Sequence, residues 1–367
     1  MIKQIILLAL SMLPGITSLC QRLPINELNV RWNLHKGFIL RHGTEVEHLA
    51  RQRPWLLEGD FYYQTRGKKL WHQLHSYPEI GCSINFVFLE RSQPVGNMIS
   101  AVIYMAKPLI KTKRSTLRVR IGLGPGYVFK IFDLYSNYKN VMFGSHFNFC
   151  LNGRINYTYR VNRFLEITTG IGIIHFSNGA IKLPNQGINI PSIHAGIGLT
   201  GKSSAPLAES PVPEFKKVTM LQIFYGGGVK DEYPTGGPKF WASTLLINLN
   251  YRTSYKSGWQ AGLDFSYDPS LSRYFDRPDL PFKNKLNIGL LLGYELYFGK
   301  LSLLIQAATN VYDVNKIYLP FYQRYGLRYY LCENFFAQLT MKSHFGSVDY
   351  VETGIGFNLP HFWKKSD

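Results

Sequence analysis

The stretch FNFCLNGRINYTYR, residues 147–160, decides the fold class of this chain. Side chains of a β-strand alternate between the two faces of its sheet. One face of this stretch is apolar and carries Phe147, Phe149, Leu151, Ile155, Tyr157 and Tyr159. The other face is polar and carries Asn148, Cys150, Asn152, Arg154, Asn156 and Thr158. A packed soluble core would bury such a polar face at high cost. A polar lumen behind a lipid-facing band accommodates it, so the stretch predicts a strand of a transmembrane β-barrel.

The composition of the whole chain favours the same class. Among 367 residues there are 24 Tyr, 24 Phe and 33 Gly, while only 17% are charged. Aromatic, glycine-rich alternating segments are typical of outer-membrane barrels. No later stretch holds the ~18 consecutive apolar residues of a spanning helix. We therefore expect an all-β fold, a transmembrane antiparallel β-barrel.

Alternating segments recur on both sides of the opening stretch. We expect about eight strands up to residue 200, the first beginning near Gly37, and about eight more in the C-terminal half. The stretch GKSSAPLAESPVPE, residues 201–214, is rich in Pro, Ser and Ala and is typical of a linker. Two architectures fit this pattern: two eight-stranded barrels in tandem, or one larger barrel of about sixteen strands. The linker and the completeness of the first unit favour the tandem arrangement.

The first 20 residues have the pattern of a secretory signal peptide. Lys3 supplies a charged start, an apolar core follows, and Ser18 and Cys20 offer small residues around a cleavage site. A lipoprotein signal with Cys20 acylated is an alternative that Leu19 disfavours. We thus expect four parts: a signal peptide at 1–20, a first barrel at 21–200, the linker at 201–214, and a second barrel-like half at 215–367. The dipeptide His344-Phe345 near its end suggests a degenerate repeat of the first unit.

The stretch HFSNGAIKLPNQGIN, residues 175–189, carries the candidate chemistry. It joins two alternating strands through a turn rich in Asn, Gly and Pro. His175 and Ser177 lie on the apolar face of the first strand. Asn189 is an even number of positions from the apolar residues of the second strand, so it is expected on the apolar face of that strand. A hydroxyl with an imidazole beside it is the minimum for nucleophilic acyl transfer. A His-x-Ser pair without this context would usually be only a polar strand end.

This stretch resembles the active-site hairpin of the PagL-type outer-membrane lipid A 3-O-deacylases, a family of acyl hydrolases. The close match covers residues 175–189, and a looser likeness in strand pattern runs over 36–200. The resemblance implies that Ser177 is the nucleophile and His175 its base. It also implies a lipid A substrate, a bacterial outer-membrane location and no cofactor. The family has an acidic residue where this chain has Asn189, and that departure bears on how His175 is oriented.

Further roles in the hairpin follow from this mechanism. Asn189 would accept from the second imidazole nitrogen and fix the tautomer, as Asn does in Cys-His-Asn sites. Backbone N–H groups around Asn178, Gly179 and Ala180, together with Asn185, would meet the oxyanion.

Cysteine and charge patterns limit the partners. Cys82, Cys150 and Cys332 are an odd set that we expect inside strands, with no disulfide framework and no metal site of zinc spacing. The net charge of +18 favours anionic partners. No nucleic-acid motif is present and the chain is expected to be exported, so the phosphates of lipopolysaccharide fit better than nucleic acid. The sequence leaves the oligomeric state open.

Two other classes compete with the enzyme. One is a non-catalytic outer-membrane barrel, either a porin-like channel or a structural protein that kept the hairpin. The large second half and Asn189 both favour it. A soluble β-sandwich is weaker, because the apolar stripes are uniform.

Overall fold

The protein is described from a computed structural model, which covers residues 27–41, 46–47, 52–89, 94–201 and 207–360. The expected signal peptide at 1–20, with Cys20, lies outside the described residues. The described part of the chain is almost entirely β-structure, with sixteen strands and three short helices α4 (Leu70–Leu74), α5 (Leu271–Tyr274) and α6 (Phe282–Lys285). Within the described residues, no helix has the length and apolar character needed to cross a membrane.

The first eight strands close on themselves as one antiparallel barrel, in which β1 pairs with both β2 and β8. The strands are β1 (Asn29–Gly37), β2 (Trp55–Gln64), β3 (Glu79–Phe88), β4 (Met98–Lys111), β5 (Ser115–Val128), β6 (Phe147–Arg160), β7 (Leu165–Ser177) and β8 (Ile188–Leu199).

The remaining eight strands form a second closed barrel, in which β9 pairs with β10 and β16. They are β9 (Val218–Lys230), β10 (Phe240–Arg252), β11 (Ser257–Tyr267), β12 (Leu286–Phe298), β13 (Leu301–Asp313), β14 (Phe321–Tyr330), β15 (Phe335–His344) and β16 (Ser347–Pro360). The antiparallel barrel fold is therefore confirmed. The chain forms two barrels of eight strands and not one of sixteen.

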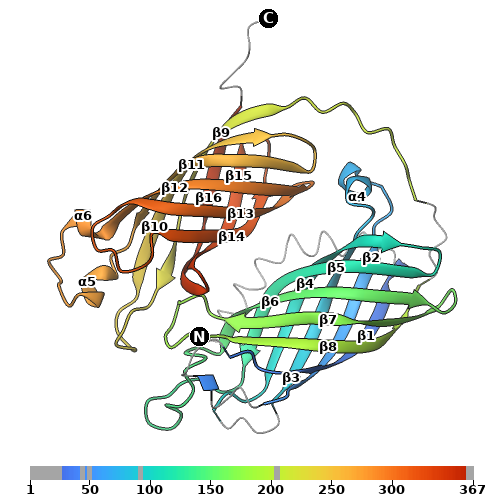
Figure 1. The fold of residues 1–367 in the computed structure, drawn as a ribbon, viewed down its shortest axis with the longest axis horizontal. Helices are drawn as coiled ribbons and strands as arrows, with labels where there is room; N and C mark the ends of the chain where they lie inside the picture. Colours follow the sequence, from blue (N-terminus) through green and yellow to red (C-terminus); the bar gives the residue numbers. More distant parts are fainter. Residues whose placement is uncertain (1–26, 42–45, 48–51, 90–93, 202–206, 361–367) are drawn as a thin grey trace, which may run out of the picture.

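Each barrel has one end closed mainly by short turns and one end with longer loops. We call these the short-turn end and the loop end. The connection from β8 to β9 leaves and enters at the short-turn ends, so the two barrels point in the same direction (Figure 1). In the first barrel the loop end carries the connections at 38–54, 89–97, 129–146 and 178–187.

Both lumens are filled by paired polar side chains. In the first, the guanidinium of Arg120 donates to Asp60 at 3.0 Å and to Glu58 at 2.9 Å, and all three are fully buried. In the second, Arg324 donates to Asp264 at 2.8 Å. Eight strands leave an interior just wide enough for side chains to fill it. Buried charges persist in such an interior because each has a partner.

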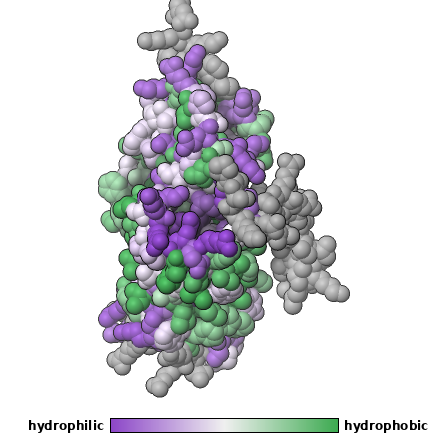
Figure 2. Space-filling model, turned by 90° about the vertical axis from the view of Figure 1, so that its right-hand side faces the viewer, coloured by the Kyte–Doolittle hydropathy of each residue, from purple (hydrophilic) through white to green (hydrophobic). Residues whose placement is uncertain are grey.

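The outer walls carry the large apolar side chains. Trp32, Leu57, Ile103 and Leu292 lie on strands and are between 46% and 69% exposed. Figure 2 faces the short-turn end and shows hydrophilic residues gathered over its middle, with hydrophobic residues along the flank of the lower barrel. The pattern is inverted relative to a soluble protein, with charge inside and apolar surface outside.

Two expectations from the sequence are wrong. The first strand does not begin near Gly37 but ends there, because β1 starts at Asn29. Its inward residues include Arg31 and His35, which are buried in the lumen. These polar residues made the segment before Gly37 resemble a polar stretch outside the barrel. Cys332 lies in the turn between β14 and β15 and not inside a strand, since β14 ends at Tyr330. All three described cysteines are free.

Candidate active site

The residues of the expected catalytic set meet at the loop end of the first barrel. His175 lies near the end of β7 and is paired directly with Asn189 of β8. Ser177 is the last residue of β7 and is paired with Phe149 of β6. The strand period places His175 and Ser177 on the outer face, two positions apart. The register between β7 and β8 then brings Asn189 beside His175 from the other strand.

The three side chains form a continuous hydrogen-bonded chain. His175 Nε2 lies 3.0 Å from Ser177 Oγ, and His175 Nδ1 lies 2.8 Å from Asn189 Oδ1. An amide oxygen can only accept, so Nδ1 carries the ring proton and donates it to Asn189. Nε2 of the neutral ring is then the acceptor for the hydroxyl of Ser177. This arrangement suits proton removal from Ser177 by His175.

Asn178 and Asn185 hold the loop that follows Ser177. The Asn178 N–H donates to Asn185 Oδ1 at 2.8 Å, and Asn178 Nδ2 donates to the Lys182 carbonyl at 2.7 Å and to Ser145 Oγ at 3.0 Å. The backbone N–H of Asn178, expected at the oxyanion, is therefore occupied inside the loop.

The next two residues suit an oxyanion site better. Gly179 and Ala180 both have positive φ, 68° and 64°. Among the described residues, neither of their N–H groups has an acceptor in the structure. A left-handed conformation costs a residue such as Ala180 roughly 1–2 kcal/mol. Backbone strain of this kind is found preferentially at functional sites.

Gly187 brings the end of the loop close to His175 and Ser177. Its φ is +66°, and a Cβ built on it would lie 3.1 Å from the Cβ of Ser177 and 3.2 Å from Cε1 of His175. Its N–H donates to the carbonyl of Met142, in the β5–β6 loop, at 3.1 Å. The site therefore has room for hydrogen but not for a methyl group at this position.

The second barrel also contacts this hairpin, which the sequence did not predict. The N–H of Asp231, just after β9, donates to the carbonyl of Ala180 at 2.9 Å. Asp231 Oδ2 accepts from the N–H of Leu183 at 2.9 Å. No local pattern marks Asp231, because its partners lie in another barrel and about fifty positions away in the chain.

An apolar wall extends from His175 and Ser177 along the outside of the barrel. It includes the outward side chains of Leu151, Ile171, Ile173 and Ile193, which are between 40% and 66% exposed. An alkyl chain lying on this wall could bring an attached ester to the rim where Ser177 lies.

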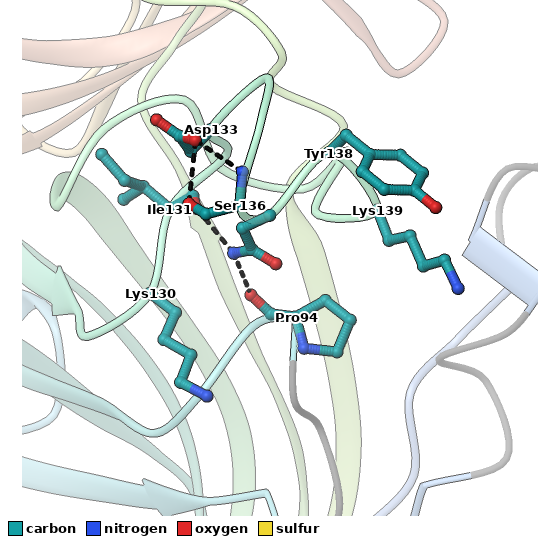
Figure 3. A pocket seen from close by; sticks show the side chains of 8 residues that line it. Pro94, Lys130, Ile131, Asp133, Ser136, Tyr138 and Lys139 are labelled. Carbon is teal, nitrogen blue, oxygen red and sulfur yellow. Dashed lines mark hydrogen bonds between the residues drawn. The ribbon is translucent and has the colours of Figure 1, made fainter.

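A separate pocket lies in the β5–β6 loop at the same end (Figure 3). Its volume is about 540 Å³ and its lining includes Lys130 and Lys139. Asp133 accepts from the hydroxyl of Ser136 at 2.8 Å, and Asn137 Nδ2 donates to the Pro94 carbonyl at 2.8 Å. The first bond lies within the β5–β6 loop and the second joins this loop to the β3–β4 connection, and the pocket lining includes none of the three catalytic candidates.

Family models match nearly the whole described chain. One described as lipid A 3-O-deacylase (PagL) matches residues 36–198, and one described as acyloxyacyl hydrolase, C-terminal domain, matches residues 219–361. No curated protein matches the chain.

Among solved structures, Neisserial surface protein A is 11% identical over 47% of this chain and 97% of its own, with a TM-score of 0.33. A structure described as "Asymmetric conductivity of engineered proteins" is 9% identical over 90% of this chain and 99% of its own, with a TM-score of 0.18. A mutant of the Rh. blastica porin is 8% identical over 90% and 99%, with a TM-score of 0.17. At such TM-scores these likenesses support no inference.

Proposed function

This chain belongs to the lipid A 3-O-deacylase (PagL) family, and we propose that it removes a fatty acyl chain from lipid A in a bacterial outer membrane by a Ser-His mechanism. The observation that carries the proposal is the hydrogen-bonded chain Ser177–His175–Asn189 on the outward, apolar side of a barrel. A soluble esterase would set such a group in a cleft. Here it is set on a wall that matches the acyl chains of a lipid.

The first half-reaction forms an acyl-enzyme. Ser177 Oγ attacks the carbonyl carbon of the ester, and His175 Nε2 takes the hydroxyl proton. The negative charge that develops on the carbonyl oxygen is met by the N–H groups of Gly179 and Ala180. The bond between the acyl carbon and the 3-oxygen of the sugar then breaks, and that oxygen takes the proton held by His175 and leaves as the 3-hydroxyl.

The second half-reaction releases the fatty acid. Water attacks the acyl carbon while His175 takes one of its protons. The bond to Ser177 Oγ breaks, and the serine oxygen regains the proton. Each proton therefore passes through one imidazole nitrogen, and the reaction needs no cofactor.

Asn189 supplies only part of what a carboxylate would supply. Its amide oxygen holds the ring and selects the tautomer, but it brings no negative charge to stabilise the imidazolium. We therefore expect turnover slower than that of the same site with an acidic residue.

The surface chemistry suits lipopolysaccharide in the outer leaflet. The apolar outer walls would lie in the hydrocarbon layer, with the loop ends facing the head groups. The net charge of +18 would attract the phosphates of lipid A. The exposed Lys182 lies on the catalytic hairpin and could meet one of them.

The test is reconstitution of the purified chain with radiolabelled lipopolysaccharide, followed by mass spectrometry of the products. Loss of one acyl chain from lipid A with the wild type, and none with Ser177→Ala, is the expected result. Intact lipid A in both samples would leave a non-catalytic outer-membrane barrel as the better description.

A further inference from the structure

We propose that the second barrel holds the catalytic hairpin in its working conformation, with Asp231 as the positioning residue. The inference rests on the proposed deacylase function, and it gives residues 215–367 a role in the same reaction. Asp231 touches no reacting atom, so it would act through the loop at 178–187.

Asp231 forms hydrogen bonds with two residues of the loop. Its N–H donates to the carbonyl of Ala180, and its Oδ2 accepts from the N–H of Leu183, both at 2.9 Å. The residue is only 2% exposed. Its side chain is held in turn, because Oδ1 accepts from the N–H of Glu232. Oδ2 also pairs with Lys239, but the Lys239 side chain is 40% exposed, so water screens that pair and it adds little to the restraint. A buried carboxylate fixed in this way presents a rigid acceptor to the loop.

A second contact comes from the outer face of β16. A Cβ built on Gly179 would lie 2.3 Å from Cγ2 of Val351, so only glycine lets the two barrels approach here. Cε2 of Phe149, on β6, lies 3.7 Å from the same point. Gly179 therefore lies close to a side chain of each barrel.

These contacts fall on the residues that would meet the oxyanion. Gly179 and Ala180 both have positive φ, which strains Ala180, and such a strained conformation persists only where the surroundings hold it. The bond from Asp231 to Ala180 and the contact of Val351 with Gly179 supply that restraint. Without them the loop would be free to turn its N–H groups away from the ester carbonyl.

Two substitutions separate positioning from general packing. Asp231→Ala removes the side-chain acceptor for Leu183 and keeps the main-chain bond to Ala180, whereas Lys239→Ala removes the ion pair of the same carboxylate and keeps both bonds to the loop. Misplacement of a catalytic group by a small distance can cost about 100-fold in rate. We expect Asp231→Ala to lower kcat by about 10- to 100-fold with KM changed less than about twofold. Lys239→Ala should stay within about twofold of wild type in both.

The measurement is a kcat and KM series on the full chain with labelled lipopolysaccharide, with heat-modifiable gel migration as the check of folding. Asp231→Asn retains one acceptor oxygen and should lie between wild type and Asp231→Ala. If Asp231→Ala fails to fold, the kcat of Asp231→Asn relative to wild type is the test. An unchanged kcat in folded Asp231→Ala, or an equal loss in Lys239→Ala, would overturn the proposal.

Hydrogen exchange separates failure of this inference from failure of the proposed function. If the wild type releases no fatty acid, the deacylase function fails. The amide of Leu183 should still exchange faster in Asp231→Ala than in wild type, because its acceptor is gone. Equal exchange in the two proteins would show that Asp231 does not hold the loop.

Discussion

His175 Nδ1 lies 2.8 Å from Asn189 Oδ1, so the ring that faces Ser177 is oriented by a neutral amide. The two residues are directly paired across β7 and β8, which makes the contact a property of the sheet register. The register restricts the orienting group to whatever side chain stands at position 189. The chemistry of that one side chain then decides how well an imidazolium is stabilised.

Changing Asn189 tests this relationship. Asn189→Ala should lower the rate of fatty-acid release by about 10- to 1000-fold. Without the Asn189 acceptor, nothing keeps the ring proton of His175 on Nδ1, and Nε2 must be unprotonated to accept the proton of Ser177. Asn189→Asp or Asn189→Glu should keep or raise the rate, and Glu reaches further across the hairpin. The measurement is the rate of fatty-acid release by the four proteins in one detergent. If Asn189→Ala is as active as wild type, another group orients His175.

Removing the nucleophile or the base should abolish activity. Ser177→Ala and His175→Ala should each lower the rate of fatty-acid release by about 10⁴-fold or more. The nucleophile and its base act as one catalytic unit, so loss of either removes nearly the whole contribution of both. Heat-modifiable gel migration should stay normal, because both side chains lie at the rim of the outer wall. Ser210→Ala, an exposed serine in the connection between the barrels, serves as the matched control. Full activity in either catalytic variant would remove its assigned role.

Gly187 offers a steric test of the site. Gly187→Ala places a methyl group about 3 Å from both His175 and Ser177, so it should separate the pair and lower activity by about 10- to 100-fold. Gly346→Ala is the control, since Gly346 also has positive φ, but its Cβ would meet open space. The strain of the left-handed backbone is then common to both variants, and only the contact differs. Equal activity in the two would show that the space over the catalytic pair is not needed.

The first barrel should fold without the second. Its eight strands close completely through the β1–β8 pairing, so the described part of residues 21–200 has no unpaired sheet edge. Heat-modifiable migration in detergent is the measurement. Lower activity of this fragment, by about 10-fold or more, is expected because the contacts of Asp231 and Val351 are lost. A fragment that never folds, while the full chain does, would contradict the prediction.

Stability should depend on pH through His72, in α4 at the short-turn end. Burial, followed by the charges of Lys69 and Lys68, lowers the pKa of His72 to about 4. The folded state therefore resists protonation, and stability is complete above the unfolded pKa of about 6.5. It should fall as the pH drops from about 6.5 toward 4. Thermal midpoints of wild type and His72→Gln across this range should converge at neutral pH and diverge in acid, with the variant less sensitive. Parallel curves of thermal midpoint against pH for the two proteins would contradict the assignment of this pH dependence to His72.

Period-two alternation was enough to locate most strands, because an apolar outer wall and a polar lumen impose opposite chemistry on successive residues. It failed at β1, where lumen charges such as Arg31 and His35 hid the pattern. The shared parity of His175, Ser177 and Asn189 was readable, since strand geometry alone places them on one face. Their chemical roles remain predictions. The contacts of Asp231 could not be read, because they depend on how two separately closed barrels lie against each other.

The common direction of the two barrels has a consequence for how such a chain can arise. An even number of strands returns the polypeptide to the side from which it started. A second barrel can therefore be appended after β8 by a linker at that same end, with no segment running back along the barrel and no reversal of topology. Joining two copies of one gene end to end would yield both barrels correctly oriented at once. Once the two barrels lie side by side, the second copy can lose its own active-site residues and still hold a loop of the first in place.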